Sequence, residues 1–327
     1  MQDIFITKIH IEKVRHLQNV EIELSNTERK HLILTGKNGS GKTSLLEAMS
    51  HCVQRKQYEF GRNDPYIIHY FSKLSKIENS SVVISYSQEN MNLLNSIFVY
   101  ITAARTQFIV PKAIEPLEIK GKTIVERDAS KEFLKYILNL DYQLYGAQSE
   151  SNKALEANLV KWFDNFLAAL RYIYDCQELK LKRDAKNLAF IIEMPGREPF
   201  ALHEMSDGYA AFFKIIMELL MRLENTDAVV EYENSAIVMI DEIETHLHVE
   251  LQKRVLPFLT KMFPNIQFIV ATHSPLVITS LENAVVYDLE KNERLEKPSF
   301  YSYKTVIESF LDTNSINTFA TIAKSLI

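Results

Sequence analysis

The feature that most constrains the fold is a cluster of glycines near the start of the chain. Only 8 glycines occur in 327 residues, yet Gly36, Gly39 and Gly41 all fall within the segment GKNGSGKT. This segment has the spacing G-x-x-x-x-G-K-[ST] of a phosphate-binding loop. A short apolar run, HLILT, precedes it, and apolar residues such as Leu45 and Met49 follow at helical spacing. A chance glycine turn would predict nothing about its neighbours, so the strand, loop and helix order favours nucleotide binding.

The chemistry of such a loop requires this spacing. Glycine backbone lets successive N–H groups point into one concavity around a phosphate, and the N-terminus of the following helix adds its dipole. Lys42 would bring a positive charge to the β- and γ-phosphates, and Thr43 would offer a hydroxyl to Mg²⁺. We therefore expect ATP and Mg²⁺ to bind here. The predicted nucleotide-binding residues of the loop are Gly36, Lys37, Asn38, Gly39, Ser40, Gly41, Lys42, Thr43 and Ser44.

The segment AIVMIDEIETHLHVELQ, residues 236–252, offers either a transition-metal site or catalytic carboxylates. Its first residues predict a buried parallel strand that delivers Asp241 at its end, where a carboxylate would hold Mg²⁺. Glu242 would point elsewhere and act as the general base on the attacking water. Zinc is disfavoured, because His246 and His248 are two residues apart and would lie on opposite sides of a helix.

A second apolar strand, IQFIVAT, ends at His273 about thirty residues later. A histidine at the same edge of the sheet could hydrogen-bond the γ-phosphate or the attacking water. A surface histidine beside the next helix is the alternative. Because two matched elements precede it, we assign His273 to the catalytic site.

The order of strands and helices predicts an α/β fold with a mostly parallel sheet. Residues 4–36 read as three strands, and a helical pattern covers residues 130–175. Two or three strands are expected around the turn PGRE, followed by a helix that starts near Asp207. After the strand at residues 284–290 we expect helical segments to the end of the chain.

Composition excludes several classes of protein. The net charge of −5 gives no overall positive field for nucleic acid, although the segment 180–186 (KLKRDAK) could form a local basic face or simply a solvated turn. Cys52 and Cys176 are far apart, which argues against a disulfide framework. No apolar run of about 18 residues and no signal peptide pattern is visible, so we expect a cytoplasmic protein with no membrane partner.

At this point the motifs resemble the ABC-type ATPase heads of the SMC, RecF and OLD group. The segment MSDGYAAFFKIIMELL resembles the signature loop of that group, with Met205 in place of leucine. The resemblance implies that Ser206 and Gly208 reach the γ-phosphate of a partner protomer. An ordinary serine helix cap is the alternative. It also implies that Arg15, at the first turn, approaches the nucleotide, and that Gln107 forms the glutamine loop, with Arg105 as a further contributor.

The resemblance implies one ATPase head over residues 1–327: a P-loop NTPase with a mostly parallel sheet, an N-terminal antiparallel β part and a small helical lobe. Lobe I would comprise residues 1–128 and 235–327, and lobe II residues 129–234. The helical insertion is too short for long coiled-coil arms, since a hairpin of this size reaches roughly 30 Å. Only some 50 residues follow His273, too few for a fused nuclease domain.

The motifs are especially similar to short AAA-family ATPases of bacterial anti-phage systems, PtuA-like and retron- or TOPRIM-associated. This resemblance implies a homodimer around two ATP molecules, or a higher oligomer, that controls an effector nuclease or toxin. A RecF-like DNA-binding ATPase in repair is the main alternative, with nucleic acid as the partner. A scaffold that binds ATP without hydrolysing it is disfavoured by Glu242.

Overall fold

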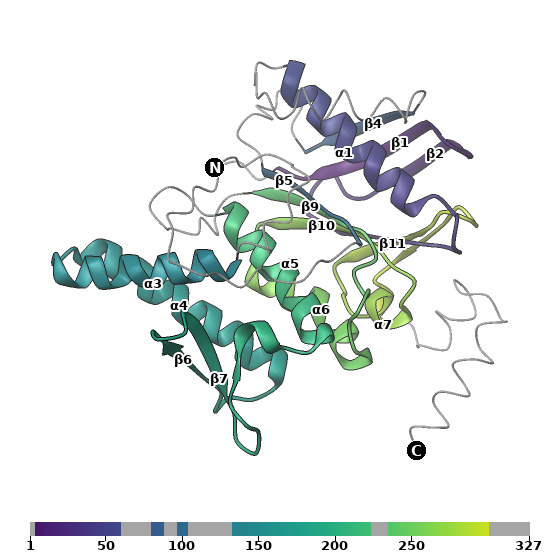
Figure 1. The fold of residues 1–327 in the computed structure, drawn as a ribbon. Coiled ribbons are helices and arrows are strands. Elements are labelled where there is room, and N and C mark those ends of the chain that lie inside the picture. The colour runs from purple at the N-terminus through teal and green to yellow at the C-terminus, as the bar shows by residue number, and fades with distance from the viewer. Residues whose placement is uncertain (1–3, 60–79, 88–96, 104–132, 224–234, 301–327) are drawn as a thin grey trace.

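A six-stranded, mostly parallel sheet forms the centre of the molecule (Figure 1). The computed structural model describes residues 4–59, 80–87, 97–103, 133–223 and 235–300. Neighbouring strands are parallel except for the edge strand β12, which is antiparallel to β11. In spatial order the strands are β12 (Glu293–Glu296), β11 (Ala284–Asp288), β3 (His31–Thr35), β10 (Ile266–Ala271), β9 (Ala236–Ile240) and β5 (Ile97–Ile101).

The inner strands are mostly apolar because both faces of the sheet are covered. Along β9, Ile237 and Met239 pack into the core on one face, whereas Val238 and Ile240 pack into the core on the other. The same alternation occurs along β3, β10 and β11. The predicted α/β class with a mostly parallel sheet is thus confirmed. Because these strands are parallel, their carboxyl ends meet at one edge of the sheet.

One face of the sheet is covered by helix α1 (Lys42–Glu59) and a small antiparallel sheet (Figure 1). That sheet has the order β2–β1–β4. Its strands are β1 (Ile6–Val14), β2 (Leu17–Glu23) and β4 (Ser81–Tyr86). Val14 pairs with Leu17, so β1 and β2 are joined by a two-residue turn, and Arg15 in that turn has a left-handed φ of 53°.

The other face is covered by helices α5, α6 and α7, and a hairpin of α3 and α4 packs into the same core (Figure 1). A second antiparallel sheet, β6–β7–β8, follows α4. These helices are α3 (Phe133–Ser149), α4 (Lys153–Tyr174), α5 (Asp207–Leu223), α6 (Val249–Met262) and α7 (Pro275–Ile278). The strands are β6 (Lys180–Asp184), β7 (Ala189–Glu193) and β8 (Phe200–Ala201), and short 3₁₀ turns span Leu202–Glu204 and Pro298–Phe300.

These elements confirm the expected helical stretch, the strands around the turn PGRE and the helix that starts at Asp207. The α3–α4 hairpin is short, as its length in sequence implies: 22 residues in α4 correspond to roughly 33 Å. The boundaries of the two lobes fall in or beside segments outside the described residues, so the division into lobes stays a prediction.

A buried glutamine joins the central sheet to the N-terminal strand. The side chain of Gln267 on β10 is fully buried. Its oxygen accepts the N–H of Ile6 at 2.7 Å, and its nitrogen donates to the carbonyls of Ile6 and Lys30 at 2.9 and 2.8 Å. Because buried backbone groups need partners, this one side chain fixes β1 against the sheet.

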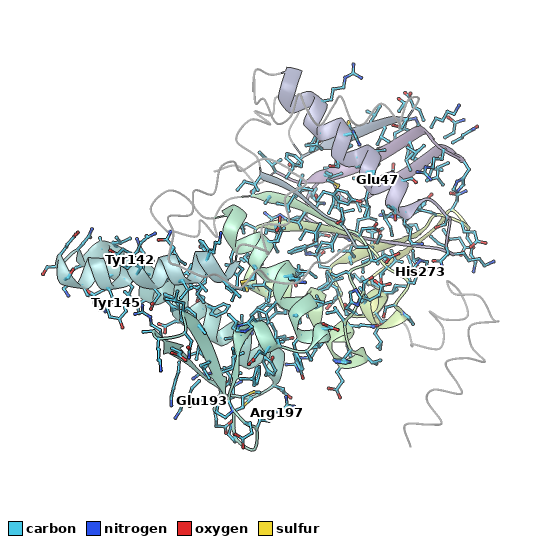
Figure 2. The ribbon with its side chains drawn as sticks, in the orientation of Figure 1. Glu47, Tyr142, Tyr145, Glu193, Arg197 and His273 are labelled. Atoms are coloured by element: carbon cyan, nitrogen blue, oxygen red, sulfur yellow. The ribbon has the colours of Figure 1, made fainter. Side chains whose placement is uncertain are left out.

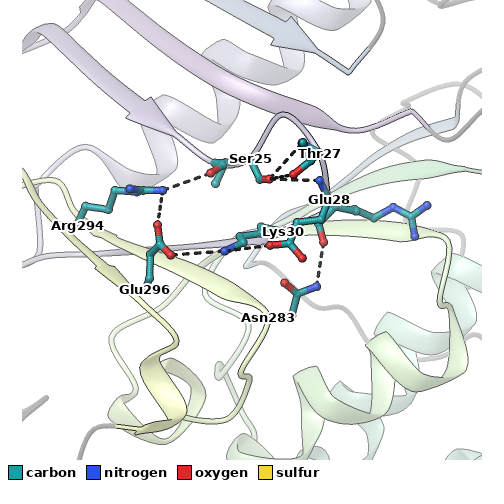
Figure 3. Close-up of polar contacts among 9 residues, drawn as sticks. Ser25, Thr27, Glu28, Lys30, Asn283, Arg294 and Glu296 are labelled. Carbon is teal, nitrogen blue, oxygen red and sulfur yellow. Dashed lines mark hydrogen bonds and ion pairs between the residues drawn. The ribbon is translucent and has the colours of Figure 1, made fainter.

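The expectation of helix directly after β11 is wrong for residues 293–296, which form strand β12. Asn292, with a left-handed φ of 53°, ends the turn that brings this segment back against β11. Figure 3 shows the polar contacts that hold the strand: Arg294 donates to the carbonyl of Leu24 and pairs with Glu296, and Glu296 also meets Lys30. The rest of the predicted helical tail, residues 301–327, lies outside the described residues.

Candidate functional site

The glycine-rich loop leaves β3 at the edge of the sheet and enters α1, as the sequence predicts. Gly36, Gly39 and Gly41 have φ values of 128°, 84° and 99°, which residues with a side chain rarely adopt. A Cβ atom on Gly36 would also lie 2.8 Å from the hydroxyl of Ser40. The loop therefore depends on glycine for its backbone conformation and for its packing.

The ammonium group of Lys42 lies inside this loop. Lys42 is buried, and its Nζ donates to the carbonyls of Gly36 and Lys37 at 2.8 and 3.1 Å and to the hydroxyl of Ser40 at 3.4 Å. Burial lowers the pKa of Lys42, while Glu244, Asp241, Glu242 and Asp288 oppose that shift. Four carboxyl groups thus act electrostatically on one cation at the edge of the sheet.

Two predicted magnesium ligands meet at this edge. The hydroxyl of Thr43 at the start of α1 donates to Oδ2 of Asp241, just after β9, at 2.8 Å. Burial is the main factor that raises the pKa of Asp241, and its Oδ1 is buried without a hydrogen-bond partner among the described residues. Since Mg²⁺ prefers oxygen ligands, the Thr43 hydroxyl fits the ion together with the Asp241 carboxylate, whose Oδ1 has no hydrogen-bond partner among the described residues.

Glu242 follows Asp241 in a strained backbone conformation. Its φ of 44° lies in the left-handed region, which is uncommon for a residue of this type. The turn after β9 keeps Glu242 half-buried, and the hydroxyl of Thr245 donates to its Oε2 at 3.0 Å. The N–H of Thr245 also bonds to the carbonyl of Glu242 at 2.9 Å. The structure therefore holds this carboxylate separately from that of Asp241.

His273 lies at the end of β10, at the edge of the sheet that carries the phosphate loop (Figure 2). Burial lowers the pKa of His273, the charge of Lys42 lowers it further, and Glu242 opposes the shift. The imidazole is therefore neutral near pH 7 and close enough to interact electrostatically with both Lys42 and Glu242. Its backbone N–H donates to Oε1 of Glu244 at 2.5 Å.

The hairpin turn between β1 and β2 also lies against the phosphate loop. The ring nitrogen Nε2 of His16 is 3.2 Å from the carbonyl oxygen of Ser40, and Cδ1 of Leu17 lies 3.0 Å from the position that a Cβ of Gly41 would take. Burial raises the pKa of Glu47 on α1 (Figure 2), and the charge of Arg15 opposes that shift. Sequence reasoning selected Arg15 but missed His16 and Glu47, although Glu47 lies one helical turn after Thr43.

The remaining loop residues differ in exposure. Asn38 is exposed and Ser44 is buried, while Lys37 is exposed and its ammonium group meets Glu290 at 3.1 Å. Asp288 at the end of β11 was also missed: it is 1% exposed, and its Oδ1 lies 3.3 Å from the Cβ position of Gly36.

The signature segment at the start of α5 contacts the turn after β9. Ser206 is exposed just before the helix. Gly208 is buried, and a Cβ on it would lie only 2.6 Å from Cδ2 of His248. Tyr209 places its ring edge-on to His248, with 6.3 Å between centroids. The glycine therefore lets α5 approach the segment that carries Glu242, a role within one chain that the sequence alone did not indicate.

Three further points concern the glutamine loop, metal-ligating clusters and membrane-spanning helices. Gln107 and Arg105 lie outside the described residues. Within the described ranges, no group of three or more His, Cys, Asp or Glu side chains is arranged to hold a metal ion. Among the helices of those ranges, none is long and apolar enough to cross a membrane.

Comparison with known proteins places this arrangement in a family. Residues 5–295 match the model of the RecF/RecN/SMC N terminal domain. The chain is 28% identical to "Retron Ec83 probable ATPase" of Escherichia coli over 183 residues. This aligned segment covers 55% of this chain and 31% of that protein. It is 23% identical to "Septu protein PtuA" of Bacillus mycoides over 310 residues. This alignment covers 89% of this chain and 41% of that protein.

A similar solved structure is an SMC head domain with an extended coiled coil, bound to the C-terminal domain of ScpA, from Pyrococcus furiosus. Its TM-score is 0.48 at 12% identity, over 94% of this chain and 100% of that one. The alignments span less than half the length of the two curated relatives. The family match, together with the sheet order and the phosphate loop, confirms the predicted ATPase-head fold. The chain belongs to the RecF/RecN/SMC N terminal domain family.

Proposed function

We propose that this protein binds ATP with Mg²⁺ and hydrolyses it to ADP and phosphate. The observation that carries the proposal is the hydrogen bond between Thr43 and Asp241, which joins the phosphate loop to the end of β9. Lys42, held by the two loop carbonyls, would bring its charge to the β- and γ-phosphates. The similarity to the relative named as a probable ATPase supports the same activity.

In this proposal each residue at the edge of the sheet has one role. Thr43 and Asp241 hold Mg²⁺, which neutralises phosphate charge when bound. Glu242 accepts a proton from the attacking water. His273, neutral because burial lowers its pKa, hydrogen-bonds the γ-phosphate or that water. Arg15 approaches the nucleotide from the hairpin turn.

The test of the activity is Mg²⁺-dependent ATP hydrolysis by the purified chain. Lys42→Ala should abolish nucleotide binding, because the cation inside the loop is lost. Lys153→Ala is a matched control, since Lys153 lies on the exposed first turn of α4. If Lys42→Ala and Lys153→Ala bound and hydrolysed ATP equally, the nucleotide site would be elsewhere.

We further propose that two copies close around two ATP molecules, with Ser206 and Gly208 of each protomer completing the other site. Ser206 supports this role because it is exposed at the N-terminus of α5, where a phosphate oxygen would meet free N–H groups. Ser206→Arg should leave ATP binding by the monomer intact and block the ATP-dependent dimer. An unchanged dimer in light scattering would exclude this role for Ser206.

The cellular role we propose is control of an effector nuclease or toxin in bacterial anti-phage defence. The similarity to a retron-associated ATPase and to a Septu protein supports this role. The alternative, a RecF-like ATPase that binds DNA in repair, is favoured by a 50-residue match at 46% identity to the DNA replication and repair protein RecF of Rickettsia prowazekii. That match covers only 15% of the chain, so we place it second.

Two measurements separate these roles. Co-purification with a nuclease or toxin encoded beside the gene, together with phage protection that is lost in Lys42→Ala, would support effector control. Salt-dependent DNA binding by the isolated chain would support the RecF-like role, because phosphate contacts release counterions. The net charge of −5 favours the first outcome.

A further inference from the structure

Glu244 joins the ends of two neighbouring strands at the candidate site. It lies three residues after Asp241, in the turn that leaves β9. Its Oε1 accepts the backbone N–H of His273, the second residue after β10, at 2.5 Å. A carboxylate that accepts a backbone N–H forms one of the stronger hydrogen bonds available to a protein. The carboxylate therefore fixes the backbone of His273 relative to the turn that carries Glu242.

The turn itself is held so that Glu244 cannot move freely. The N–H of Ile243 bonds to the carbonyl of Ala271 at 3.3 Å, and the N–H of Leu247 bonds to the carbonyl of Glu244 at 2.8 Å. Gln252 on α6 then donates to the carbonyl of Leu247 at 3.0 Å. These bonds hold both ends of the turn, so the side chain of Glu244 meets His273 with little freedom.

The second oxygen of Glu244 has no donor among the described residues. Its Oε2 is buried and makes no hydrogen bond within the described part of the chain. Of the carboxyl groups near Lys42, Glu244 is the one that acts most strongly on it. A buried carboxylate oxygen without a donor is costly unless a donor enters. A water molecule is the kind of donor that would satisfy this oxygen.

We propose that Glu244 is a positioning residue for His273: through Oε1 it sets where the imidazole lies relative to the phosphate, and through Oε2 it accepts a hydrogen bond from water in the site. This inference rests on the proposed ATP hydrolysis and adds a residue to it. A glutamine at 244 keeps an oxygen acceptor for the N–H of His273, whereas an alanine removes it. The two substitutions therefore separate the hydrogen bond from the negative charge.

The first test measures hydrogen exchange at the backbone N–H of His273 and needs no catalytic turnover. Glu244→Ala should raise the exchange rate of this amide by about tenfold or more, because a hydrogen bond to a charged acceptor is lost. Glu244→Gln should raise it less. Glu250→Ala, on the exposed first turn of α6, is the matched control and should leave it unchanged. An amide equally protected in Glu244→Ala and the unsubstituted protein would overturn the inference.

The second test is a cycle with His273→Ala, measured as kcat and KM for ATP. Glu244→Ala should lower kcat by up to about a hundredfold, since a displaced group can cost that much, and change KM little. In the His273→Ala background it should lower kcat no further, because the residue it positions is absent. Additive losses would contradict action through His273. If the unsubstituted protein hydrolysed no ATP, the proposed function would fail. The exchange measurement would still show whether Glu244 holds the backbone N–H of His273.

Discussion

The stability of this protein should depend on the protonation of one buried histidine, His31, the first residue of β3. His31 is 8% exposed, and its Nδ1 accepts the backbone N–H of Phe268 on β10 at 3.0 Å. That nitrogen must be unprotonated to accept a hydrogen bond. Burial, and to a smaller degree the charge of Arg29, lowers the pKa of His31 to about 4.

The sign and size of the effect follow from these facts. An unfolded chain binds a proton at His31 below its ordinary pKa of 6.5, whereas the folded protein does not until about pH 4. Lowering the pH from 6.5 to 4 therefore favours the unfolded state, with a limit of about 3.4 kcal/mol. At pH 5 the expected loss from His31 is about 2 kcal/mol relative to pH 7.5.

The matched variant is His31→Asn, which keeps an acceptor near the position of Nδ1 but does not titrate. Urea unfolding of both proteins at several pH values between 7.5 and 5 gives two stability curves. Other groups titrate in both proteins, so their contributions cancel in the difference. We expect the difference to fall by about 2 kcal/mol over this range. Parallel curves would refute the reasoning and show that His31 is protonated equally in both states.

Other changes test the site and the framework that holds it. Glu242→Gln should leave ATP bound and trap the ATP-dependent dimer, seen as nucleotide retained on gel filtration; hydrolysis at the unsubstituted rate would exclude Glu242 as the base. The effects of Gly208→Ala and His248→Ala on the free energy of unfolding in urea should not add, because the added methyl group meets the imidazole. We expect a coupling free energy of about 1 kcal/mol. Additive effects would mean that α5 adjusts freely. Gln267→Leu should lower the free energy of unfolding by about 3 kcal/mol, since it leaves buried backbone groups unpaired; a change below about 0.5 kcal/mol would show that water replaces the glutamine.

The parts of the site that the sequence predicted are those carried by local pattern. The residue types of the phosphate loop and of the apolar strand before Asp241 indicate the local backbone conformation. These two elements can therefore be predicted from the sequence. Their meeting at Thr43 followed from the rule that parallel strands end at one edge of a sheet.

The parts that were missed depend on contacts between distant segments. His16 meets Ser40 only because a two-residue turn brings the hairpin against the loop. Gly208 lies against the imidazole of His248, a contact across forty residues that no spacing rule encodes. The strand β12 was missed because its charged sequence is specified by pairing with β11 and by the polar contacts of Arg294, not by apolar alternation.

The left-handed backbone at Glu242 has a consequence for protein engineering. Glycine or asparagine would suit a φ of 44° better than glutamate, so a redesign for stability alone would replace the residue. The gain would be about 1 kcal/mol or less, and it would remove the carboxylate that we propose as the general base. Conformational preference and chemistry therefore conflict at this position, and a glutamate retained there in other proteins would mark those that keep hydrolysing nucleotide.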